Sequence, residues 1–243
     1  MTSHLLSPLT IISTCLTLFM AFLFWLRMHK ITQTLDIPNE KKNKTSIISG
    51  ALLFGWFFLV LLLAILDFYH VSEKIISPLV PLGFAVPVII GLYLMKTSTT
   101  FQMILDRISQ EWLIALQVYR IGGIVFVLLY YQGLLPAYFA FPSGVGDLVV
   151  GLSAPIVAFL YWKRASFSRS IAIAWNGIGI IDLLIAISSG IILVFHPPFQ
   201  LIPVSPTTEI MTQFPLVLVP VFAVPFGLLL HLFSLRLLFK KNN

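Results

Sequence analysis

The sequence predicts an all-α integral membrane protein, a bundle of seven transmembrane helices, and three observations support this prediction. Of the 243 residues, 58% are hydrophobic and only 10% are charged, whereas a soluble domain carries about 25% charged residues. The mean hydropathy is +0.99, and the apolar residues form runs long enough to cross a hydrocarbon core of about 30 Å. The basic residues fall between these runs, which is typical of topology signals and argues against a nucleic-acid-binding groove.

The first expected span covers residues 5–26 and measures about 33 Å at 1.5 Å per residue. No lysine or arginine precedes it, and Arg27 and Lys30 follow it without a small-residue cleavage site. A secretory signal has a basic segment first and a cleavage site last. We therefore expect a retained first helix and not a cleaved signal peptide.

Six further spans are expected after a polar segment that ends near residue 45. Pro78, Pro81 and Pro87 predict that the outer half of the third span is kinked or irregular, because proline removes a helical hydrogen bond. The connection 196–215 is rich in proline and almost uncharged, so we expect either a cap over the outer end of the bundle or a stiff loop. The six spans cover about residues 46–68, 76–95, 112–135, 144–162, 171–195 and 214–239.

A change of pattern separates the third span from the fourth. The apolar residues Phe101, Ile104, Leu105, Ile108 and Trp112 recur there at helical spacing. Polar residues lie between them. This pattern predicts a short amphipathic helix over residues 97–111 that lies in the membrane interface and leads directly into the fourth span.

The distribution of basic residues predicts the orientation. Lysines and arginines gather after the first, third, fifth and seventh spans, whereas the alternate loops hold only Lys74. By the positive-inside rule, the N-terminus lies outside and the C-terminus lies in the cytoplasm. An odd number of spans requires the two termini to lie on opposite sides, so the span count and the charges agree.

Arg120 is the most informative residue, because it lies within an apolar run. A charged side chain inside a membrane is costly and usually faces a bundle interior or an aqueous cavity. Helical projection places polar residues of spans four to seven on faces that converge. The candidate substrate- or proton-binding residues are Gln117, Arg120, Asp147, Asn176, Asp182 and His231.

Depth along the helices favours one partner for Arg120. Arg120 and Asp182 lie about 12 Å and 16 Å from the cytoplasmic side, which predicts a central ion pair. Asp147, counted from residue 144, lies only about 5 Å below the outer face, where the alternative is a helix cap. An Arg120–Asp147 pair is the alternative. Asn176 and His231 are expected in the cytoplasmic third, where an interfacial imidazole is the structural alternative for His231.

The expected charges suggest proton coupling. Arg120 faces two aspartates, so one carboxylate is in excess while His231 is neutral. Either one aspartate then carries a proton or His231 is charged. A purely structural network has the same composition, and this alternative stays open.

Three classes of function follow. The favoured one is a permease-like protein for a small solute or for protons, lined by spans four to seven, although no inverted repeat is evident. An intramembrane lipid-modifying enzyme is less favoured, because H-E-x-x-H, G-x-S-x-G and Cys-His arrangements are absent from the sequence. The third is a receptor or assembly protein. The seven-span plan is similar to that of rhodopsins in topology alone, because the last span has no lysine for a retinal Schiff base.

Composition also limits cofactors and partners. Cys15 is the only cysteine, which excludes disulfides within the chain and thiolate metal sites. We expect no metal, no cofactor and no nucleic acid. The expected partners are the lipid bilayer and a small molecule or proton, and the expected location is the plasma membrane of a bacterium. The substrate and the oligomeric state are not determined by the sequence.

Overall fold

The computed structural model describes residues 3–71, 77–195 and 200–240, and within these ranges it is helical without any strand. The loop residue Lys74 and residues 196–199 of the expected cap lie outside the described residues. The elements in chain order are α1 Ser3–Gln33, α2 Asn39–Ile65, α3 Leu79–Thr97, α4 Thr99–Leu105, α5 Gln110–Ala115, η1 Leu116–Gly123, α6 Ile124–Tyr131, α7 Ala137–Trp162, α8 Ser168–Ile192, η2 Glu209–Thr212, η3 Val219–Ala223 and α9 Val224–Phe239.

Seven helical segments of the described chain are long and apolar enough to cross a membrane, which confirms the predicted fold class. They are Thr14–Gln33, Asn39–Ile65, Leu79–Thr97, Gln110–Tyr131, Ala137–Trp162, Ser168–Ile192 and Val219–Phe239. The orientation of the bundle and the interfacial position of residues 97–111 stay predictions.

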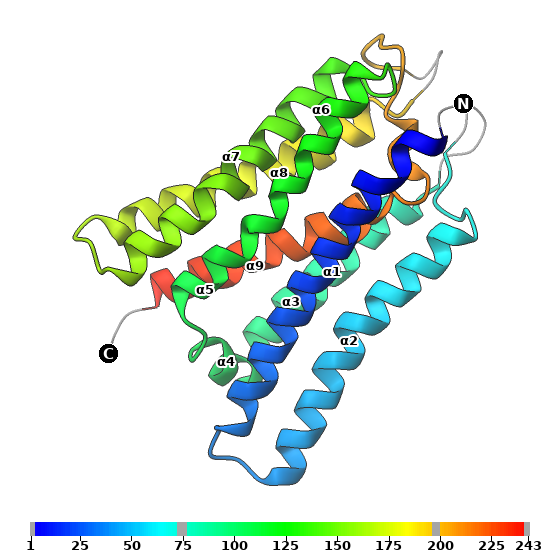
Figure 1. Cartoon of the computed structure of the whole chain (residues 1–243). Coiled ribbons are helices and arrows are strands. Elements are labelled where there is room, and N and C mark those ends of the chain that lie inside the picture. The colour runs from blue at the N-terminus through cyan, green and yellow to red at the C-terminus, as the bar shows by residue number, and fades with distance from the viewer. Residues whose placement is uncertain (1–2, 72–76, 196–199, 241–243) are drawn as a thin grey trace.

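Two of the seven segments form the centre of the bundle. At least half of the residues of Gln110–Tyr131 and of Val219–Phe239 are buried, whereas few residues of α2 and α3 are buried. Figure 1 shows α7 and α8 on one side of this centre and the α1–α2 hairpin on the other. The central segments therefore separate the two pairs, and their polar residues Gln117, Arg120 and His231 are buried.

Both central segments depart from the regular α-helix. Residues Leu116–Gly123 form a 3₁₀ helix between α5 and α6, and Val219–Ala223 form a π-helical turn directly before α9. Pro225 explains the second departure, because proline clashes with the carbonyl four residues earlier and a wider turn relieves this clash. Such breaks in a helix are frequent at functional sites.

The structure divides the expected amphipathic helix of residues 97–111 into two pieces. Helix α4 ends at Leu105, and α5 begins at Gln110. The backbone of Asp106 is still helical, and the break lies at Ser109, whose backbone is extended. The side chain of Asp106 accepts bonds from Arg236 and Lys240 at the end of α9. Ile104 and Leu105, on the apolar face, are fully buried in the protein core.

Helix α7 begins at Ala137, seven residues before the start expected for the fifth span. Pro142 lies inside the helix and does not end it, because neighbouring segments of a membrane protein can satisfy the carbonyl that proline leaves free. Asp147 is therefore ten residues, or about 15 Å, from the start of the helix. The expected position of Asp147 as a cap just below the outer face is wrong.

The seventh span, in contrast, begins later than expected. Residues 214–217 form turns, and the helical segment follows them. Between α8 and this segment, the hydroxyl of Thr208 donates a 2.7 Å hydrogen bond to the carbonyl of Gly190, and the hydroxyl of Thr212 accepts a 3.3 Å bond from the amide of Val71. Both threonines are buried, so this described part of the connection covers one end of the bundle, called here the Thr208 end. The opposite end is called the Gln110 end.

Candidate functional site

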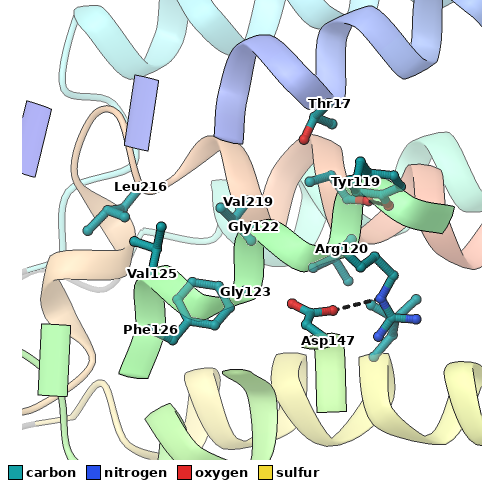
Figure 2. Close-up of a pocket in the computed structure, with 13 residues that line it drawn as sticks. Thr17, Tyr119, Arg120, Gly122, Gly123, Val125, Phe126, Asp147, Leu216 and Val219 are labelled. Carbon is teal, nitrogen blue, oxygen red and sulfur yellow. Dashed lines mark hydrogen bonds and ion pairs between the residues drawn. The ribbon is translucent and has the colours of Figure 1, made fainter. Parts of the chain in front are cut away.

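Arg120 lies on η1 at the centre of the bundle, where its side chain is 1% exposed. Its Nε donates a 2.6 Å hydrogen bond to Oδ1 of Asp147 on α7 (Figure 2). Its Nη2 donates to Oδ2 of Asp182 on α8. The sequence suggested one of these ion pairs or the other, whereas the structure contains both.

The level of the two aspartates explains why one arginine reaches both. Counted from the connection between α7 and α8, Asp147 lies fifteen residues along α7 and Asp182 fourteen residues along α8. These separations correspond to roughly 22 Å and 21 Å. The two carboxylates therefore lie at nearly the same height, with the guanidinium between them.

His231 on α9 binds the same guanidinium. Its Nε2 lies 3.1 Å from Nη1 of Arg120, and its Nδ1 lies 2.9 Å from Oδ1 of Asn176. Because an arginine nitrogen can only donate, Nε2 must accept, and the hydrogen is on Nδ1. The geometry thus assigns a neutral imidazole. His231 is fully buried, so the alternative of an interfacial imidazole is wrong.

A line of hydrogen bonds continues from His231 toward the Gln110 end. The amide of Asn176 donates to Oγ of Ser234 at 2.8 Å, and the amide of Gln110 donates to the same oxygen at 2.5 Å. Gln110 and Ser234 are not among the candidate residues predicted from the sequence. The signal was present for Gln110, because it lies seven residues before Gln117 and thus on the same face of a helix.

Gln117 does not join this line. Its Nε2 donates a 2.9 Å hydrogen bond to the carbonyl of Gly227 and so connects the fourth span to α9. Its Oε1 is buried and has no hydrogen-bond partner among the described residues. Of the six candidates, the structure therefore joins five in one network and places Gln117 beside it.

Glycines allow the charged side chains to come together. A Cβ at Gly123 would overlap Cβ of Asp147, one at Gly146 would overlap the carboxylate of Asp182, and one at Gly179 would overlap the imidazole of His231. Backbones that approach closely at glycines are typical of membrane helix pairs.

Two cavities meet at Asp147. The first, of about 40 Å³, is lined by the polar side chains of Thr17, Tyr119, Arg120 and Asp147 (Figure 2). Because a water molecule needs roughly 10–15 Å³ of such volume, the cavity has room for about three waters. The second, of about 100 Å³, extends from Asp147 to Thr208 at the Thr208 end. Asp182 lines neither cavity.

The residues of the site do not resemble a metal centre. Within the described part of the chain, no three His, Cys, Asp or Glu side chains are grouped so that they could hold an ion. The guanidinium occupies the space between the two carboxylates.

Comparison with known proteins identifies a family but no activity. The family model described as "Domain of unknown function (DUF8737)" matches residues 77–239, which include α3 to α9 and every residue of the network. Helices α1 and α2 precede the matched region. Neither the curated proteins nor the solved structures give a match. Because the match covers about two thirds of the sequence, the chain belongs to the DUF8737 family.

Proposed function

We propose that this protein is a permease-like membrane protein for a small solute, coupled to protons, and that its site is the cluster of Arg120, Asp147 and Asp182. One observation carries the proposal. A single guanidinium is shared by two carboxylates in the middle of the bundle, and the imidazole beside it is neutral by geometry. With both carboxylates ionised, the cluster has one negative charge in excess.

This excess charge favours the uptake of a proton or of a cationic group. An uncompensated charge in a protein interior costs several kcal/mol of free energy, because it has lost its hydration shell without gaining a partner. The guanidinium binds Asp147, Asp182, His231 and the carbonyl of Gly179, but its single positive charge balances only one of the two carboxylates. A proton on one carboxylate makes the cluster neutral without any rearrangement.

Asp147 is the residue that we expect to take up the proton. It lines both cavities, one of which reaches the Thr208 end, whereas Asp182 lines neither. The line through Asn176 and Gln110 has a different role in this proposal. Carboxamides relay protons poorly, so we assign these two residues to holding His231 and Arg120 in place.

The two broken helices supply the second element of the proposal. The small cavity is lined by Gly122 and Gly123 of η1 and by Val219 and Ala223 of η3. Many transporters bind their substrate at such discontinuous helices near the middle of the membrane. We propose the same role for η1 and η3.

The proposed orientation follows from the basic residues, which place the N-terminus outside. The proposed location is the plasma membrane of a bacterium. In this orientation the Thr208 end faces outward, so the cavity to Asp147 opens toward the exterior. Reporter enzymes fused after residue 243 and after residue 67 test this topology. Activity of the cytoplasmic reporter at residue 67, and not at residue 243, would reverse the orientation.

The decisive experiment follows the protonation of Asp147 directly. The purified protein is reconstituted in phosphatidylethanolamine–phosphatidylglycerol vesicles, and infrared difference spectra are recorded as the pH is changed. We expect a titrating protonated-carboxyl band that disappears in Asp147→Asn and persists in Asp106→Asn, a matched change outside the site. A wild-type protein without such a band would contradict proton uptake.

Flux measurements then test transport itself. Vesicles that enclose a pH-sensitive dye are exposed to a panel of amino acids, sugars, nucleosides and inorganic ions across a pH gradient. We expect at least one solute to move protons in the wild-type protein and in Asp147→Glu, and not in Asp147→Asn. A protein that is inert to the whole panel while its carboxyl titrates would favour a receptor or assembly role.

A further inference from the structure

A long groove separates the α1–α2 hairpin from α3, α4 and α9. It encloses about 780 Å³, which is within the range of roughly 300–1,000 Å³ that is usual for ligand sites. Figure 1 places α2 at the edge of the bundle, away from α7 and α8, so the groove lies on the other side of the bundle centre from the Arg120 cluster. Its walls are largely apolar and include Trp25, Trp56, Leu59, Ile90 and Phe233.

One end of the groove is basic. Lys41 and Lys44 line it at the start of α2, together with Thr45 and Ser49, and Ser98 lies across from them at the start of α4. The two lysines are three residues apart and thus share a helix face. Among the residues described, no aspartate or glutamate lines the groove. The basic end is therefore complementary to an anion, while the remainder is complementary to hydrocarbon.

The length of the groove corresponds to one leaflet of a bilayer. From Lys44 to Leu59 along α2, the distance is roughly 22 Å. Half of a bilayer, including its headgroup region, measures about 20–22 Å. A phospholipid with its phosphate at Lys41 and Lys44 would thus have its acyl chains beside Leu59 and Ile90.

We propose that this groove binds one anionic phospholipid, with the phosphate at Lys41 and Lys44 and the acyl chains along α2 and α3. Basic pockets between membrane helices recognise anionic headgroups in this way. The proposal does not depend on the transport proposed above, because it uses none of the residues of the Arg120 cluster.

Two tryptophans make the groove observable. Trp25 and Trp56 line it, so a lipid with brominated acyl chains that enters the groove quenches their fluorescence. Trp162 is exposed and would report on any lipid, so the experiment uses the Trp162→Phe background. The probes are vesicles that contain either brominated phosphatidylglycerol or brominated phosphatidylcholine with the same chains.

The expected result is a preference for phosphatidylglycerol. Each lysine near an anionic membrane surface contributes enough for roughly a fivefold effect, so we expect a preference of about five- to thirtyfold. In Lys41→Gln/Lys44→Gln, the preference falls to nearly one. In the control Lys42→Gln/Lys163→Gln, whose lysines do not line the groove, it is retained.

A second pair of variants tests the apolar part. A Cβ at Gly55, which lines the groove, meets nothing within 4 Å, and the same holds at Gly177 on α8. Because the Cβ of Gly55→Leu has room and its side chain takes up space in the groove, we expect weaker quenching by both lipids and unchanged folding. Gly177→Leu leaves quenching unchanged.

Three outcomes would overturn the proposal. They are equal quenching by the two lipids in the wild-type protein, an equal loss of preference in both lysine double variants, and an absence of quenching by either lipid. The last outcome, accompanied by crosslinking between copies across α2, would assign the groove to self-association.

Discussion

Removing the charge of Arg120 is the most direct test of the buried network. Arg120→Met replaces the charged side chain by an unbranched apolar one and deletes every bond of the guanidinium. Two carboxylates are then left beside each other in the middle of the bundle. The matched rescue is Arg120→Met/Asp147→Asn/Asp182→Asn, which deletes all three charges and keeps the side-chain volumes nearly constant.

The magnitude follows from the two ion pairs. Breaking a buried pair by removing one partner costs about 3–5 kcal/mol, mainly because the remaining charge is buried and unpaired. We expect Arg120→Met to lose at least this amount of unfolding free energy. The triple variant should recover most of the loss, because it leaves no unpaired charge in the interior, which is the main cost of breaking a buried ion pair. Asp106→Asn, at an exposed pair, should cost about 0–1 kcal/mol.

The assay is reversible unfolding in mixed micelles, followed by circular dichroism at low and at high salt. Salt should change the effect of Asp106→Asn and leave that of Arg120→Met almost unchanged, because buried pairs are screened much less than exposed ones. Wild-type stability of Arg120→Met would refute the network. A triple variant no more stable than Arg120→Met would refute the charge argument.

Three further predictions use other parts of the structure. Gly179→Ala should lower the unfolding free energy by about 1–3 kcal/mol, because its methyl group overlaps the imidazole of His231, whereas Gly177→Ala, in open space, should not. Ser234→Ala should lower the unfolding free energy by about 1–3 kcal/mol, because it leaves the buried amide groups of Asn176 and Gln110 without their shared acceptor. A loss below about 0.5 kcal/mol in the same unfolding assay would contradict the hydrogen-bond assignment. Burial alone would raise the pKa of the Asp106 carboxyl, but hydrogen bonds and charges from Lys240 and Arg236 hold this pKa below its usual value. The contribution of Asp106 to the unfolding free energy is therefore present above pH of about 4 and is lost as the pH falls through the lowered pKa. A plot of unfolding free energy against pH should be flatter on its acid side in Asp106→Asn.

The composition of the chain was sufficient for the fold class. Runs of apolar residues longer than a bilayer is thick must be helical, because lipid offers no partners for backbone groups. This rule is local, so a window of sequence is enough to apply it. Arg120 and the other candidates were found by the same local argument, since a polar residue within an apolar run is conspicuous wherever the run lies.

The tertiary structure decided which of these residues meet. Asp147 reaches Arg120 because α7 continues through Pro142, and whether a proline ends a helix depends on neighbours that only the fold provides. His231 accepts from Arg120 because Gly179 leaves room for its ring. Contacts between segments so distant in the chain depend on backbone separations of a few ångströms at glycines, and hydropathy contains no information on these separations.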